Sequence, residues 1–193
     1  MSRPLVISDC DEVLLYMVAP FRDWLHESQG VRFEMVGNDF AGAMKYADGD
    51  TPVPPEEIWR LLRGFFDTEM HRQTPIPGAV EGMARLAEHA DVVILTNLTD
   101  ERQLHRTEQL AAHGIHARVF TNQGPKGPAL ARIVADAQLV ADDHGSDLGA
   151  QLCSSTLEIE RGQYLQHCLS TDLGDDVVRE VVVEVVKNYV VWK

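Results

Sequence analysis

The sequence is poor in cysteine and in positive charge. Three cysteines in 193 residues form no CxxC or Cys/His ligand spacing. Their odd number does not favour a disulfide framework, so reduced thiols in the cytosol are the simpler interpretation. Seventeen Lys and Arg against thirty Asp and Glu leave a formal net charge of -13, and the chain has no run of basic residues. This charge repels nucleic acid and anionic membranes, so neither is expected as a partner.

Long apolar runs are also missing. No stretch approaches the roughly 20 apolar residues that cross a bilayer. The N-terminal stretch MSRPLVISDCDE reaches acidic residues too early for the apolar region of a signal peptide. There is no internal repeat and no low-complexity linker. We therefore expect a cytoplasmic protein with one main domain and room for a modest insertion.

What the sequence does contain is an alternation of short apolar runs with amphipathic segments. The runs at residues 4–8, 91–97, 117–122 and 138–143 are predicted strands, and the segments at 78–90, 100–114 and 126–137 are predicted helices. Strands without polar alternation, separated by helices, indicate a parallel sheet covered on both faces. Right-handed crossovers then give an α/β fold with a doubly wound sheet, which binds ligands at the carboxyl ends of its strands.

The segment between the first two predicted strands, residues 16–77, is too long for a plain crossover. It contains FRDWLHESQG and EEIWRLLRGFFDTEM, which are typical of helices, and Pro54 and Pro55 favour a helix start before Glu56. The stretch VRFEMV is either a short strand or an extended loop. We predict a small, mostly helical insertion at 16–77, with residues 1–15 and 78–193 forming the core domain.

The C-terminal part is harder to interpret. Residues 145–157 are consistent with a helix and 157–160 with a short edge strand. In the valine-rich end, residues 175–193, polar residues recur at helical spacing although valine favours strands, and the pattern favours a helix. An exposed apolar surface used for association is the alternative.

Every predicted strand ends in a polar residue capable of chemistry. These are Asp9, Thr96 with Asn97, Thr121 with Asn122, and Asp142 with Asp143. In a strand, residues two apart point to the same face, so Asp9 and Asp11 are expected to project together. Two crowded carboxylates repel unless a cation, a shared proton or a catalytic role offsets the cost. A solvated strand end followed by a turn is the simpler alternative for this pair alone.

Four elements in order resemble the haloacid dehalogenase-like hydrolase superfamily, whose members are mostly phosphatases. VISDCDEVLL resembles its first motif, VVILTN its second, GPKGPAL with Lys126 its third, and LVADDHGSD its fourth. The resemblance runs from residue 5 to about residue 150. It implies a Rossmann-like core with a cap insertion, a Mg²⁺ cofactor and a phosphorylated small molecule as substrate.

The resemblance also implies a role for each matching residue. Asp9 would be the nucleophile that forms an aspartyl-phosphate, and Asp11 would act as general acid and base. Thr96 and Asn97 would bind the phosphoryl group, and Lys126 would offset its charge. Mg²⁺ would be held by Asp9, by the backbone carbonyl of Asp11 and by Asp143. Asp142 and Asp147 could contact the metal through water.

Other interpretations remain at the level of sequence. A dehalogenase on the same scaffold is disfavoured because its chemistry does not need the acid and base that Asp11 supplies. A non-catalytic protein that binds a phosphorylated ligand or a partner is the alternative from another functional class.

Overall fold

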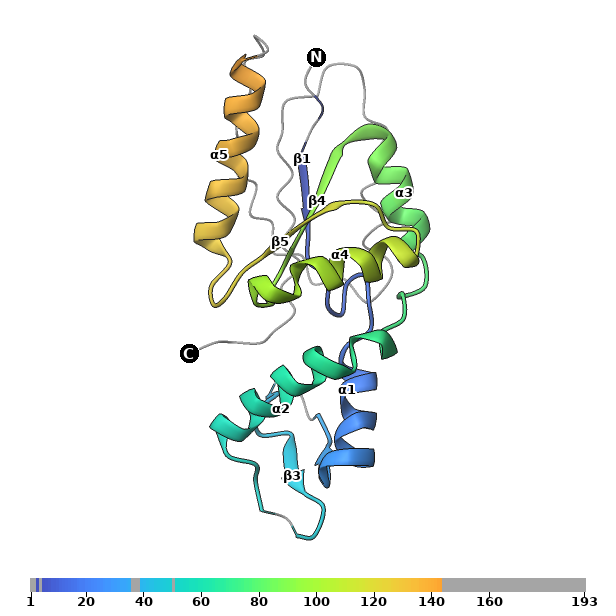
Figure 1. Cartoon of the computed structure of the whole chain (residues 1–193), viewed down its shortest axis with the longest axis vertical. Coiled ribbons are helices and arrows are strands. Elements are labelled where there is room, and N and C mark those ends of the chain that lie inside the picture. The colour runs from blue at the N-terminus through green and yellow to red at the C-terminus, as the bar shows by residue number, and fades with distance from the viewer. Residues whose placement is uncertain (1–2, 4, 36–38, 50, 144–193) are drawn as a thin grey trace. The chain divides into compact units, whose positions relative to one another are not determined.

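The computed structural model describes residues 3, 5–35, 39–49 and 51–143 (Figure 1), with side chains described up to residue 137. The chain divides into two compact units. Described residues up to Leu14 and from Pro75 onward form the core unit, and Leu15–Thr74 form the second unit. None of the helices in this part of the chain is long and apolar enough to cross a membrane.

The core unit contains a parallel sheet of three strands in the order β1-β4-β5. The strands are β1 (Leu5–Ser8), β4 (Asp91–Thr96) and β5 (Arg118–Thr121). β1 pairs with β4 so that Ser8 lies beside Ile94, and β4 pairs with β5 so that Thr96 lies beside Thr121. The carboxyl ends of the three strands therefore meet at one edge, as the apolar runs predict.

Helices cover both faces of this sheet, which confirms the predicted α/β class. They are α3 (Ala79–His89), α4 (Gln103–Ala112), preceded by the 3-10 turn η3 (Asp100–Arg102), and α5 (Gly127–Asp143). Figure 1 shows α5 on one side of the strands and α3 on the other, with α4 crossing their lower ends in this view. Ala129, Ile133 and Val134 of α5 pack on Leu5, Ile7 and Leu95 in one buried cluster.

The end of α4 follows directly from its sequence. Gly114 has a φ of 86°, a left-handed conformation that costs glycine little. The N–H of Gly114 donates to the carbonyl of Ala111, and that of Ile115 donates to Leu110. These two bonds are the Schellman pattern that satisfies the last carbonyls of a helix. Gly114 therefore ends α4.

The strand predicted at residues 138–143 is wrong, because α5 continues to Asp143. No glycine, proline or asparagine interrupts the chain between residues 138 and 143, and Gln, Leu and Ala are good helix formers. Adding a residue to an existing helix needs no new nucleation, so the helix extends through this segment. The segments expected at 145–157, 157–160 and 175–193 lie outside the described residues.

The second unit is helical with a small hairpin. It contains α1 (Val18–Trp24) running into the π-helical turn η1 (Leu25–Gln29), the antiparallel strands β2 (Val31–Phe33) and β3 (Met44–Tyr46), α2 (Pro55–Thr68) and the 3-10 turn η2 (Met70–Arg72). The two predicted helices are confirmed, and VRFEMV contributes β2.

An aromatic cluster forms the core of the second unit. Phe21 is fully buried, and its ring lies 5.3 Å from that of Phe65 and 5.9 Å from that of Phe33, both edge-on. Trp24 and Phe40 complete its ring contacts at 6.1 Å each. Edge-to-face and offset rings add to the hydrophobic gain of burial. These aromatic side chains are thus the structural core of the second unit.

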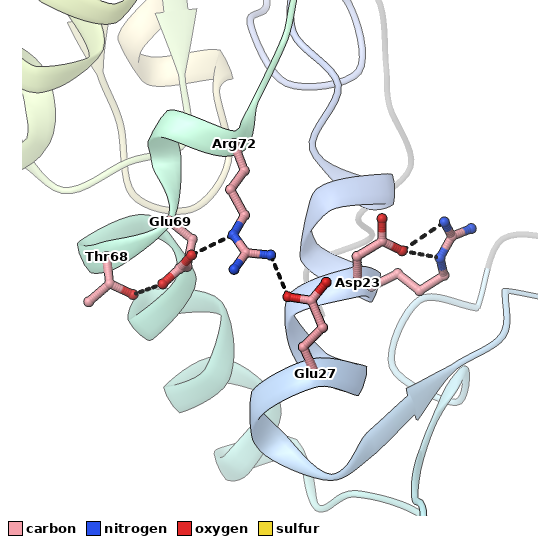
Figure 2. A network of polar contacts seen from close by, with 6 residues as sticks. Asp23, Glu27, Thr68, Glu69 and Arg72 are labelled. Carbon is pink, nitrogen blue, oxygen red and sulfur yellow. Dashed lines mark hydrogen bonds and ion pairs between the residues drawn. The ribbon is translucent and has the colours of Figure 1, made fainter.

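Polar contacts join the helices of this unit at its surface. Figure 2 shows the Arg72 guanidinium between two carboxylates, with Nε 2.6 Å from Glu69 and Nη1 2.7 Å from Glu27. Glu69 also accepts a hydrogen bond from Thr68. Glu27 belongs to η1 and Arg72 to η2, so the network ties segments 45 residues apart in the chain.

Candidate active site

The chain turns sharply after β1, and the turn carries both acids of the first motif. β1 ends at Ser8, so Asp9 and Asp11 lie beyond the strand and the alternation of a strand does not orient them. The N–H groups of Val13 and Leu14 both donate to the carbonyl of Cys10, closing one helical turn. Asp9 therefore directly precedes this turn and Asp11 lies within it, so the argument from strand geometry does not apply to them.

Glu12 is the strained residue of that turn. Its φ of 59° is the only positive value among the described residues other than glycine. The left-handed region costs an L-residue with a side chain about 1–2 kcal/mol. Such strain persists only where the surrounding structure imposes it, and it concentrates at functional sites. The sequence does not explain the charge of Glu12. In the structure this charge belongs to a residue with a strained backbone, in the turn next to the two acids of the site.

Asp9 forms an ion pair with Lys126 across the unit. Its Oδ2 lies 2.6 Å from Nζ of Lys126, with both side chains about 15% exposed. Its Oδ1 accepts a 2.7 Å hydrogen bond from the N–H of Cys10. Burial raises the pKa of Asp9, Lys126 lowers it, and Asp11 nearby raises it, so that the net shift is upward. Lys126 was predicted at a helix start, and its carbonyl accepts the N–H of Leu130 at the beginning of α5.

Asp11 is held by two other elements of the unit. Nη2 of Arg106, on α4, donates to Oδ1 of Asp11 at 2.9 Å, and Nη1 donates to Sγ of Cys10 at 3.3 Å. The hydroxyl of Thr96, at the end of β4, donates to Oδ2 of Asp11 at 3.3 Å. Both carboxylate oxygens of Asp11 are therefore engaged.

Arg106 is a site residue that the sequence analysis missed. Its side chain has no exposed surface. Burial by itself would lower the pKa of Arg106, but Asp11 and Cys10 raise it, and the net shift is upward. A signal exists in the sequence, because Arg106 lies one turn before the buried Leu110 on the same face of α4. A charge on the buried face of an amphipathic helix requires an anionic partner.

The ends of β4 and β5 are joined by polar contacts. Asn122 donates from its backbone N–H to the carbonyl of Thr96 at 3.0 Å, and from Nδ2 to Oδ1 of Asn97 at 2.9 Å. The hydroxyl of Thr121 donates to Asp100 at 2.5 Å. The structure thus brings Thr96 and Asn97 to the same edge of the sheet as the two acids. The substrate-binding role of Asn97 stays a prediction.

Asp143 does not lie at the end of a strand. It is the last residue of α5, and its side chain is outside the described part, as are residues 144 and 147. The expectation that Asp143 meets Asp9 depended on a fourth strand ending beside β1. That support is lost with the strand, and a metal role for Asp143 stays a prediction.

The acids of the turn suit a magnesium ion in type but do not form a full protein shell. Among the described side chains, no group of three or more His, Cys, Asp or Glu could hold a metal. Mg²⁺ commonly uses one or two carboxylates, keeps several waters and takes substrate phosphate oxygens. The carboxylate of Asp9 and the backbone carbonyl of Asp11 fit such a partial shell.

Cationic side chains of the site already offset the charges of its two acids. Asp9 is paired with Lys126 and Asp11 with Arg106. The family resemblance implied a Mg²⁺ ion beside the two acids. In the structure each acid has a cationic partner of its own, so their proximity does not by itself require a metal.

Similarity between this chain and known proteins was found only when structures were compared. No protein-family model and no curated protein matches it. It is structurally similar to a haloacid dehalogenase-like family hydrolase from Xanthomonas campestris, at 18% identity and a TM-score of 0.41, covering 71% of this chain and 70% of that one. It is also similar to a haloacid dehalogenase-like hydrolase from Streptococcus pneumoniae, at 10% identity and a TM-score of 0.47, covering 79% and 77%. Both likenesses concern the fold alone.

Proposed function

We propose that the protein hydrolyses a small-molecule phosphate monoester through an aspartyl-phosphate on Asp9. The observation that carries the proposal is the meeting of three groups at the carboxyl edge of the sheet. Asp9 is a carboxylate nucleophile, Lys126 is a cation 2.6 Å from it, and Thr96 contributes a hydroxyl bonded to Asp11. Positioned cations and hydrogen-bond donors are the main protein contribution to phosphoryl transfer.

In the first half-reaction, a carboxylate oxygen of Asp9 attacks phosphorus and the ester P–O bond breaks. For this step Asp11 must be in its protonated form; it gives that proton to the departing oxygen, and Lys126 offsets the charge of the transferring group. In the second half-reaction, Asp11 takes a proton from water as that water attacks phosphorus. The bond between phosphorus and Asp9 breaks, inorganic phosphate leaves and the carboxylate of Asp9 is restored.

We further propose that Mg²⁺ is the cofactor of this reaction. The carboxylate of Asp9 and the backbone carbonyl of Asp11 would hold the ion, with Asp143 as the predicted third protein ligand. When bound, the ion supplies additional neutralisation of the phosphoryl charge. The second unit, Leu15–Thr74, corresponds to the insertion predicted at 16–77, and we assign it the selection of the substrate.

The test is release of inorganic phosphate from a panel of phosphate monoesters. Turnover should be lost in Asp9→Asn, because no aspartyl-phosphate can form. Asp91→Asn is the matched control, since Asp91 is an exposed carboxylate at the opposite end of the sheet, paired with Arg3. This control should retain turnover. Exhaustive chelation should abolish activity and added Mg²⁺ should restore it; full turnover without metal would exclude the cofactor assignment.

Binding of a phosphorylated ligand without turnover is the second candidate. The ion pairs of both acids favour it, because they compensate the site without a metal and engage both oxygens of Asp11. Tight, saturable binding of a phosphate monoester, without phosphate release at any Mg²⁺ concentration, would establish this function in place of hydrolysis.

A further inference from the structure

Arg106 is unusual because a fully buried arginine supports an acid of the candidate site. It enters from α4, while Asp11 follows β1, 95 residues earlier in the chain. The guanidinium uses one terminal nitrogen for the carboxylate of Asp11 and the other for Sγ of Cys10. The planar guanidinium group of Arg106 therefore binds two adjacent residues of the first motif, Cys10 and Asp11.

The cost of burying this guanidinium indicates that it does more than fill space. Taking a charge out of water costs several kcal/mol, and the attraction to a buried partner often fails to repay it. An apolar residue at position 106, one turn from Leu110, could fill the same interior at no such cost. What an arginine adds is a fixed fork of donors that defines the direction of a carboxylate.

The contacts of Asp11 show what that fork defines. Oδ1 is held from α4 by Arg106, and Oδ2 is approached from β4 by Thr96. Two donors from different elements leave the plane of the carboxylate little freedom. Asp11 directly precedes the strained Glu12, and the backbone of this turn alone does not fix a side-chain rotamer.

We propose that Arg106 is a positioning residue that orients the side chain of Asp11 for proton transfer at the leaving group. This inference rests on the proposed hydrolysis at Asp9. A misplacement of about 1 Å can cost roughly 10²-fold in rate. Loss of the arginine should therefore lower kcat while leaving KM nearly unchanged, because the side chain of Arg106 has no exposed surface through which to contact a substrate.

The test is a double-mutant cycle measured by kcat. Arg106→Met should lower kcat by about 10–10²-fold in the parent protein. In an Asp11→Asn background the same substitution should change kcat by no more than roughly 2-fold, because the group that Arg106 orients is already gone. Arg106→Lys, which keeps the charge but not the fork, should recover only part of the loss. Arg102→Met is the matched control: this half-buried arginine precedes α4 and bonds Thr99, and its loss should leave kcat unchanged.

Chemical rescue separates orientation from general damage to the fold. Guanidinium ion, added to Arg106→Ala far below denaturing concentrations, should raise kcat, whereas urea at the same concentration should not. Rescue should also be absent when Asp11 is Asn. If circular dichroism shows that Arg106→Met and Arg106→Ala do not fold, the double-mutant cycle with Asp11→Asn is measured with Arg106→Lys.

The outcomes separate this inference from the proposed function. An equal loss of kcat with and without the Asp11 carboxylate would assign Arg106 to stability alone and overturn the inference. Unchanged kcat in folded Arg106→Met would overturn it as well. Absence of phosphate release from the parent protein would instead refute the hydrolysis, and the inference with it.

Discussion

Lys126→Met removes the cation that faces Asp9 and keeps most of the length of the side chain. The pair is 2.6 Å apart and about 15% exposed on each side, so solvent replaces little of the lost interaction. Breaking a buried ion pair by removing one partner typically costs about 3–5 kcal/mol. Asp9 can instead take up a proton, and neutralising an ordinary carboxyl at pH 7 costs about 4 kcal/mol. We therefore expect a loss of roughly 3–4 kcal/mol in the free energy of unfolding at pH 7.

The loss should depend on pH in a defined direction. The pKa of Asp9 is already raised in the folded protein, first by burial, and removal of Lys126 raises it further. Consider a carboxyl whose pKa is higher in the folded protein than its value of about 3.9 in the unfolded chain. At a pH below about 3.9 such a carboxyl does not lower the free energy of unfolding. The cost grows as the pH rises through the folded pKa. The difference between Lys126→Met and the parent should thus be small near pH 4 and largest at neutral pH.

Urea unfolding followed by circular dichroism, repeated between pH 4 and 7, measures this difference. In a chain of this size a loss of 3 kcal/mol corresponds to a fall in Tm of about 6–12 °C. Arg132→Met is the matched control, because Arg132 is an exposed cation on the same helix, α5. Adding Asp9→Asn to Lys126→Met should restore most of the stability. A loss that is equal at pH 4 and pH 7, or equal to that of Arg132→Met, would refute the reasoning.

Two further predictions concern the turn after β1 and the core of the second unit. Glu12→Val should be less stable than Glu12→Gly by about 1–2 kcal/mol, since the φ of 59° suits glycine and opposes a β-branched residue. Urea midpoints decide this, and the reverse order would show that the turn relaxes. Phe21→Ala should cost about 3–5 kcal/mol, because it empties the centre of the aromatic cluster. Phe21→Leu should cost clearly less, and calorimetry of both variants compares them; equal losses would contradict a packed cluster.

Much of the fold follows from local pattern. β4 and β5 are short runs rich in β-branched residues, and α4 ends where Gly114 permits a left-handed turn. The extension of α5 through residues 138–143 was not predicted, because a short apolar run is compatible with either a strand or a helix. The hairpin of β2 and β3 depends on pairing across a loop, which no local pattern reveals.

The candidate site was predictable in its residue types but less so in its pairings. Asp9 and Lys126 are adjacent only because β1 and the start of α5 meet in the folded core unit. Arg106 was missed for a different reason, since an arginine on a helix is usually exposed, and only its position relative to Leu110 marks it as buried. Side-chain partners of this kind are set by topology and not by local sequence.

The two ion pairs of the site also bear on how fast an anionic molecule can arrive. Asp9 with Lys126 and Asp11 with Arg106 sum to no net charge, within a chain whose formal charge is -13. A dianion approaching this protein meets repulsion at long range, and these two ion pairs add no net positive charge to oppose it. Salt shortens the range of that repulsion to about 10 Å at 0.1 M. Association should therefore become faster as ionic strength rises, the opposite of the behaviour of sites that attract their substrate by charge, and stopped-flow measurements at several salt concentrations would register the sign.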